Sequence, residues 1–131
     1  MIAIDTNVLV RLLVRDDEKQ FAQVLQLFND HVDEPASLWV SDVVLSEVTW
    51  VLSRTYGFDR ASVATALRAM TVNATLALES ASEVRQALTL YEQGPADFPD
   101  CLLAVQAAAG GADRVVTFDR RMRHLPGVQL L

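Results

Sequence analysis

Hydrophobic positions along the chain follow two alternating patterns. Short apolar runs predict strands at residues 2–4, 38–40, 74–78, 114–118 and 128–131. Between them, apolar residues three and four positions apart predict helices that begin near residues 7, 16, 41, 59, 80 and 99. Strands that are apolar throughout and alternate with helices indicate a parallel sheet covered on both faces. We therefore expect an α/β fold, a three-layer α/β/α sandwich with a central parallel sheet, in a single domain spanning residues 1–131.

Capping and helix-breaking residues indicate where these helices begin and end. Ser41 or Asp42 can cap the long helix that follows the second strand, and this helix should end near Gly57. Pro99 suits the first turn of a later helix, which should run through Ala109. The predicted helices are thus separated by short connections.

Composition argues against a membrane-spanning or a disulfide-rich secreted protein. Of the 131 residues, 51% are hydrophobic and 21% are charged, which allows one compact domain with its own core. The apolar runs are too short to cross a bilayer, and the start of the chain lacks the pattern of a signal peptide. The single cysteine, Cys101, excludes an internal disulfide framework and fits a reducing compartment. We expect a cytoplasmic protein with no membrane segment.

The formal net charge of −6 argues at first against a nucleic-acid partner. The placement of the basic residues changes this picture, because arginine is suited to bidentate contacts with phosphate. Three arginines follow Asp119 closely: Arg120, Arg121 and Arg123. Two more, Arg11 and Arg15, lie one turn apart in the first predicted helix. A solvated surface remains the alternative for each of them.

Carboxylates follow two of the predicted strands. Asp5 comes directly after the first strand, and Asp119 follows the strand at residues 114–118. In a parallel sheet, functional groups gather beyond the carboxyl ends of the strands. The structural alternatives are that Asp5 caps the first helix and that Asp119 lies in a polar turn.

Glu47 interrupts the apolar stretch VVLSEVTWVL, which otherwise suits a buried helix. A buried glutamate needs a partner, yet Val44 cannot complete a capping box with it and Val51 cannot form a salt bridge with it. A solvent-facing side chain beside Arg54 is the alternative. A metal or a shared acidic site explains Glu47 better.

Two more acids lie in the segment GPADFPDCLLA. Asp97 can cap the helix that follows, while Asp100 falls in its first turn, where the helix dipole favours a negative charge. Asp100 also opens a buried helical run, from which it can project toward the strand ends.

Several carboxylates gathered at one edge raise one another's pKa values unless a cation lies among them. Oxygen ligands of this kind suit Mg²⁺ or Mn²⁺. Zinc is disfavoured because His31, Cys101 and His124 share no ligand spacing. Such a metal can activate water for phosphodiester cleavage.

Four segments, MIAIDTNVLVRLLV, VSDVVLSEVTWVL, ADFPDCLLA and VVTFD, resemble the PIN domain in their order and spacing, and more closely the VapC-type toxins of bacterial toxin–antitoxin pairs. The resemblance covers essentially the whole chain and implies the α/β/α sandwich. It also implies an active site that binds Mg²⁺ or Mn²⁺. By this resemblance the catalytic acids and metal ligands are Asp5, Glu47, Asp100 and Asp119, with Asp97 as an additional ligand and Thr6, Asn7 and Thr117 as accompanying polar residues.

The resemblance further implies a metal-dependent endoribonuclease, the toxin of a type II pair, that cleaves structured RNA such as tRNA. Its expected partners are RNA, a cognate antitoxin and a second copy of the chain in a homodimer. The apolar face formed by Phe21, Val24, Leu25 and Phe28 is a candidate groove for the antitoxin, with ordinary core as the alternative. A non-catalytic PIN-like module that binds RNA or protein remains the alternative function.

Other acidic α/β proteins fit less well. Receiver domains need paired acids after the first strand and a late lysine, and haloacid-dehalogenase-type phosphatases need Asp-x-Asp there. In this chain Asp5 is followed two positions later by Asn7, where the phosphatases need the second Asp. Its only lysine is Lys19, which is too early in the sequence to be the late lysine of a receiver domain. Nucleases that act on DNA flaps generally carry more acids on a longer chain.

Overall fold

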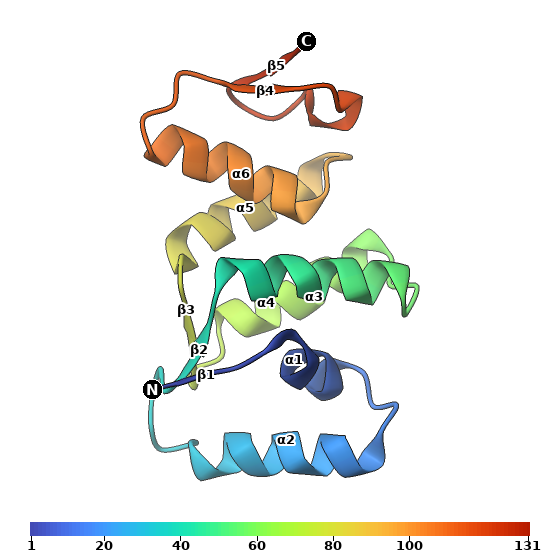
Figure 1. The fold of residues 1–131 in the computed structure, drawn as a ribbon, viewed down its shortest axis with the longest axis vertical. Helices are drawn as coiled ribbons and strands as arrows, with labels where there is room; N and C mark the ends of the chain where they lie inside the picture. The colour runs from blue at the N-terminus through green and yellow to red at the C-terminus, as the bar shows by residue number, and fades with distance from the viewer. The chain divides into compact units, whose positions relative to one another are not determined.

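The computed structural model describes residues 1–131. The chain divides into two compact units, an N-terminal unit (Met1–Ala81) and a C-terminal unit (Ser82–Leu131), each of which is described by itself (Figure 1). None of the helices combines the length and the apolar character that crossing a bilayer requires.

A parallel sheet of three strands, in the order β1-β2-β3, forms one side of the N-terminal unit. Its strands are β1 (Ile2–Ala3), β2 (Leu38–Val40) and β3 (Leu76–Leu78). Leu38 of the central strand lies opposite Ile2 on one side and Leu76 on the other. The short apolar runs therefore form parallel strands, as the sequence predicts.

Four helices complete the N-terminal unit: α1 (Thr6–Leu13), α2 (Glu18–Asp30), α3 (Asp42–Arg54) and α4 (Arg60–Thr71). All four begin after a side chain that accepts a backbone N–H of the first turn, namely Asp5, Asp17, Ser41 and Asp59. Helix α1 packs against both α2 and α3, and α3 contacts α4 (Figure 1).

Helix α3 separates its residues clearly between core and surface. Leu45, Val48 and Leu52 are fully buried and recur at the spacing of one helical face. On the other side Val43 is 68% exposed and Trp50 is 58% exposed. The helix thus fills its share of the core without these two side chains.

The C-terminal unit begins at the second residue of α5 (Ala81–Gln93). Its other elements are α6 (Phe98–Ala109), β4 (Val115–Thr117), the short 3₁₀ helix η1 (Arg120–Met122) and β5 (Val128–Leu130). Strands β4 and β5 are parallel, with Val115 opposite Val128. Tyr91 of α5 and Phe98 of α6 meet edge to face with ring centroids 6.2 Å apart. Cys101 is fully buried on α6.

The α/β fold class and its parallel strands are confirmed; the strands form one three-stranded and one two-stranded sheet. The expected helix ends shift slightly. Helix α1 begins at Thr6, and α3 ends at Arg54, three residues before Gly57. Gly57 has a φ of 68°, which a residue without Cβ adopts readily, so it forms the turn toward α4 rather than the end of α3.

Candidate active site

Asp5 stands between β1 and α1, at the N-cap of the helix. Its Oδ1 accepts the backbone N–H of Thr6 at 2.8 Å. An N-cap side chain usually accepts from the second or third helical residue, whereas Thr6 is the first. Asp5 therefore does cap α1, but through the N–H of the first helical residue. Asp5 is exposed to solvent.

Glu47 of α3 finds its partner on α1. The Oγ1 of Thr6 donates a hydrogen bond of 2.5 Å to Oε2 of Glu47, although the two residues are 41 positions apart in the sequence. Thr6 is buried, and Glu47 is exposed on α3. Because Thr6 also donates its backbone N–H to Asp5, this one residue connects the two candidate acids of the N-terminal unit.

The surface alternative for Glu47 is right in part. The side chain is exposed, but its carboxylate accepts the threonine hydroxyl. The guanidinium carbon of Arg54 lies instead 5.7 Å from the centre of the Trp50 ring.

In the C-terminal unit, Asp97 occupies the N-cap position of α6 without making a side-chain cap hydrogen bond. Its Oδ2 accepts Nη2 of Arg121 at 3.3 Å. The capping interpretation of Asp97 therefore holds for its backbone and is wrong for its carboxylate.

Asp119 lies directly after the turn that leaves β4, at the start of η1. Its own N–H donates to Oγ1 of Thr117 at 3.0 Å. Oδ1 accepts the backbone N–H of Arg121 at 2.9 Å, and Oδ2 accepts Nη2 of the same residue at 3.1 Å. These hydrogen bonds to Arg121 hold the pKa of Asp119 below its ordinary value.

Asp100 shows the opposite effect. It lies half-buried in the first turn of α6. Burial raises the pKa of its carboxyl, and the negative charges of Asp97 and Asp119 raise it further, against a smaller effect of Arg121. Asp100 is thus close enough to Asp97 and Asp119 for their charges to act on its carboxyl.

The donors in this group are all carboxylate oxygens, which suits a hard divalent cation. A cation beside Asp100 would stabilise the ionised form of its carboxyl, whose pKa is raised mainly by burial. No set of three or more His, Cys, Asp or Glu side chains in the structure has the geometry of an assembled metal centre. The fit to Mg²⁺ or Mn²⁺ rests on the chemistry and charge of the donors.

The arginines singled out in the sequence have different environments. Arg121 is paired with Asp97 and Asp119. Arg11 is hydrogen-bonded to Gln20 and Asp16. These two side chains are engaged within the protein, which favours the structural interpretation for Arg11. Sequence reasoning missed the counter-ion role of Arg121; its position two residues after Asp119 was the available signal.

Arg15 is also engaged internally. Its Nε lies 3.1 Å from the carboxylate of Glu18, and its guanidinium carbon lies 4.4 Å from the centre of the Phe21 ring. Both contacts hold Arg15 beside the first turns of α2.

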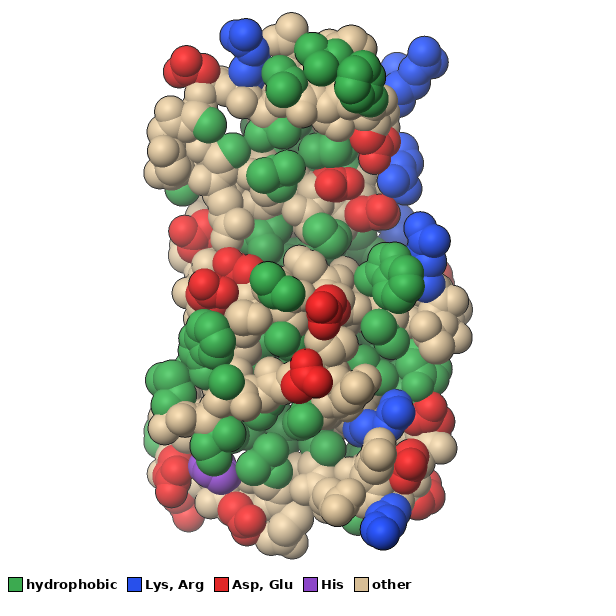
Figure 2. All heavy atoms as spheres, in the orientation of Figure 1, with side chains coloured by type: hydrophobic (Ala, Val, Ile, Leu, Met, Phe, Trp, Pro, Cys, Tyr) green, Lys and Arg blue, Asp and Glu red, His purple; other side chains and the backbone are tan.

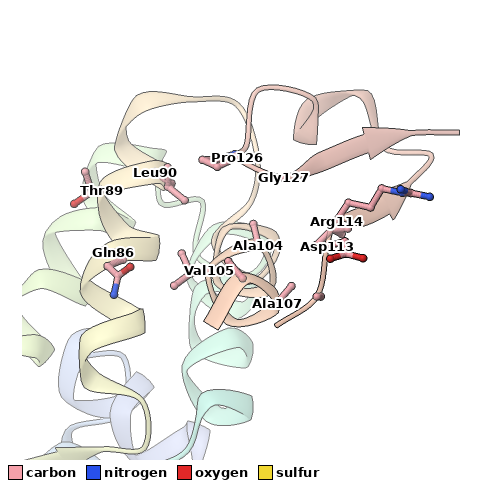
Figure 3. A pocket seen from close by; sticks show the side chains of 13 residues that line it. Gln86, Thr89, Leu90, Ala104, Val105, Ala107, Asp113, Arg114, Pro126 and Gly127 are labelled. Atoms are coloured by element: carbon pink, nitrogen blue, oxygen red, sulfur yellow. The ribbon is translucent and has the colours of Figure 1, made fainter. Parts of the chain in front are cut away.

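A hollow of about 470 Å³ lies elsewhere in the C-terminal unit, bordered by α5, α6 and the segments around β4 and β5 (Figure 3). Leu90, Val105 and Pro126 line it, and Asp113 and Arg114 stand at its β4 side. None of the candidate acids lines this hollow. It is therefore separate from the acidic residues described above.

The sequence matches the PIN domain family over residues 2–128, so the chain belongs to that family. Nucleases are typical of PIN domains. No curated protein matches the chain. Among solved structures, a toxin–antitoxin complex from Klebsiella pneumoniae contains a chain with 18% sequence identity; the alignment covers 98% of the present chain and 96% of that one, with a TM-score of 0.35.

Proposed function

We propose that this chain is a single PIN domain over residues 1–131 and a divalent-metal-dependent endoribonuclease, the toxin of a type II toxin–antitoxin pair that cleaves structured RNA such as tRNA. The observation that carries the nuclease proposal is the match to the PIN domain family over residues 2–128, together with three carboxylates, Asp97, Asp100 and Asp119, that lie near one another in the C-terminal unit. Repelling carboxylates are costly in a purely structural role and useful where a cation is to be bound.

The proposed catalytic acids are Asp5, Glu47, Asp100 and Asp119, which would hold Mg²⁺ or Mn²⁺ with Asp97 as an additional ligand. The resemblance of the four motifs to VapC-type toxins supports this set. When bound, the metal supplies activation of water and stabilisation of the charge that develops at the phosphodiester.

The protein's own residues orient these acids. The hydroxyl of Thr6 fixes one oxygen of Glu47 and leaves its negative charge in place. The hydroxyl of Thr117 fixes the backbone N–H of Asp119, and Arg121 balances the charge of Asp97 and Asp119. Such preorganisation lowers the cost of arranging charged groups at the moment of reaction.

A non-catalytic module that binds RNA or protein is the second candidate. One observation favours it: the guanidinium of Arg121 already neutralises Asp97 and Asp119. If Arg121 keeps this position, it takes the place of the cation, and the acids serve a structural role.

The proposed partners are RNA, a cognate antitoxin and a second copy of the chain in a homodimer. On the apolar face of α2, Val24 is buried whereas Leu25 is 39% exposed, so part of this face remains accessible to an antitoxin segment. We place the activity in the cytoplasm, where the single thiol of Cys101 stays reduced.

Purified protein, incubated with total tRNA, tests the proposal. We expect cleavage with Mg²⁺ or Mn²⁺ and none in EDTA, and Asp5→Asn should remove the activity while circular dichroism stays unchanged. Asp30→Asn, which changes an exposed acid at the end of α2, serves as the charge-matched control. Equal cleavage by Asp5→Asn and wild type would reject the assignment, and RNA binding without any cleavage would support the non-catalytic module.

A further inference from the structure

Trp50 is an unusual surface residue. Exposed hydrophobic side chains occur among the charged ones over the face drawn in Figure 2, so exposure alone does not mark a binding residue. Trp50, however, is among the largest side chains and is 58% exposed. Its indole presents a broad aromatic surface to solvent, and proteins use such surfaces for recognition.

The core does not require this indole. Leu45, Val48 and Leu52 of α3 are fully buried on the opposite side of the helix. Helix α3 is therefore anchored in the N-terminal unit without Trp50.

The neighbours of Trp50 on α3 are chemically distinctive. Glu47 precedes it by three residues and Arg54 follows it by four, so the three side chains share one face, each about one helical turn from the next. The guanidinium of Arg54 lies 5.7 Å from the ring centre, within the range of a cation–π contact. This face thus combines a proposed catalytic acid, an aromatic ring and a positive charge.

We infer that Trp50 and Arg54 form a stacking platform for single-stranded RNA, on which a nucleobase beside the scissile phosphodiester stacks on the indole while Arg54 contacts a neighbouring phosphate. Every base has a π-face, and stacking on exposed aromatic rings beside arginines is a general means of holding unpaired nucleotides. The inference rests on the proposed function only in the link to cleavage; the stacking itself does not require catalysis.

The small size of the platform favours RNA over a protein as the occupant. The exposed apolar residues Val43 and Trp50 are separated along α3 by the carboxylate of Glu47. A stable protein interface buries about 800 Å² on each partner around a core depleted of charge. The platform instead offers one ring and one cation, the combination that a single nucleotide can satisfy.

Tryptophan fluorescence can test the platform in EDTA, where no cleavage is expected. In a Trp39→Phe background, Trp50 is the only tryptophan. Titration with a short oligouridine should quench its emission, and an abasic oligomer of equal length should quench it much less. By anisotropy of a labelled oligouridine, Trp50→Ala should weaken binding about tenfold and Trp50→Phe should largely restore it. Val72→Ala, at another exposed apolar residue, is the matched control.

Arg54 is tested through the salt dependence of the same binding. Arg54→Gln should reduce the slope of log affinity against log salt by about one, whereas Lys19→Gln on α2 should not. Unchanged oligouridine affinity of Trp50→Ala would overturn the platform, and a change only in self-association by light scattering would identify a protein contact instead. If no RNA is cleaved but quenching and the tenfold loss are observed, the platform stands and the nuclease proposal fails.

Discussion

Glu47 in the N-terminal unit is held by the hydroxyl of a threonine, whereas Asp97 and Asp119 in the C-terminal unit are held by a guanidinium. Both arrangements fix carboxylates near the surface. They differ in charge, because Thr6 orients its partner without compensating it, while Arg121 supplies a positive charge to two acids.

The N-terminal set of acids is thus oriented by a neutral hydroxyl and the C-terminal set by a charged guanidinium. The C-terminal set contains its own counter-ion, so it tolerates the absence of metal. Asp100 is the exception within that set, since its pKa is raised despite the nearby arginine. We therefore expect Asp100 to gain most from a bound metal in the C-terminal unit.

The largest expected effect is a difference in RNA cleavage between the Asp100→Asn and Asp97→Asn variants. Asp100→Asn should lower metal-dependent RNA cleavage by roughly 10²–10³-fold, because it would remove a proposed ligand of the metal that offsets the negative charge developing at the phosphodiester. Asp97→Asn should retain measurable activity, since Asp97 is already paired with Arg121. Initial rates at saturating Mg²⁺ give the ranking; the reverse order would show that the third motif was aligned three residues out of register.

A smaller effect tests the hydroxyl in the N-terminal unit. Thr6→Val removes the donor to Glu47 with little change in volume, and we expect cleavage to fall about tenfold, the equivalent of one hydrogen bond to a charged group. Thr6→Ser keeps the hydroxyl and should remain within a few-fold of wild type. Equal losses in the two variants would show that packing of the threonine methyl, rather than its hydrogen bond, matters there.

The smallest effect is on the stability of metal-free protein. The pKa of Asp100 is raised, so its contribution to folding is present below its unfolded pKa, near 4, and is lost as pH rises through its folded pKa. The pKa of Asp119 is lowered, so its contribution is present above its unfolded pKa and is lost as pH falls through its folded pKa. At neutral pH in EDTA, Asp100→Asn should therefore melt above wild type and Asp119→Asn below it.

Thermal melts from pH 3 to 7 measure both differences. The deficit of Asp119→Asn should shrink toward the acid end, as should the advantage of Asp100→Asn. Shifts of the same sign for the two variants at neutral pH would contradict the contrast between the two acids.

Local patterns predicted most of the fold, because strands and helices of this chain are encoded over a few residues. The run Leu38–Val40 forms β2 as predicted, and Ser41 caps α3 through its own hydroxyl. Family motifs also indicated the acids. Their partners were harder to predict, since the hydrogen bond from Thr6 to Glu47 joins residues 41 positions apart and depends on how α1 packs against α3.

Asp97 shows a second reason why the hydrogen-bond partners of the acids could not be predicted from the sequence. Its position favours an N-cap, and its backbone adopts one, but a side-chain oxygen can accept either a neutral N–H or a charged guanidinium. The charge-assisted contact with Arg121 is the one observed. The sequence alone does not indicate whether the carboxylate of Asp97 accepts a backbone N–H of α6 or the guanidinium of Arg121.

The buried thiol of Cys101 can be used to measure local opening of α6 in the C-terminal unit. It is the only cysteine, it is fully buried on α6, and it directly follows Asp100. A thiol in this position reacts with a maleimide only when the helix opens locally, so the labelling rate measures how often that segment is released from the native packing. The labelling rate of Cys101 therefore reports local opening of α6 beside Asp100, and no cysteine has to be introduced to measure it.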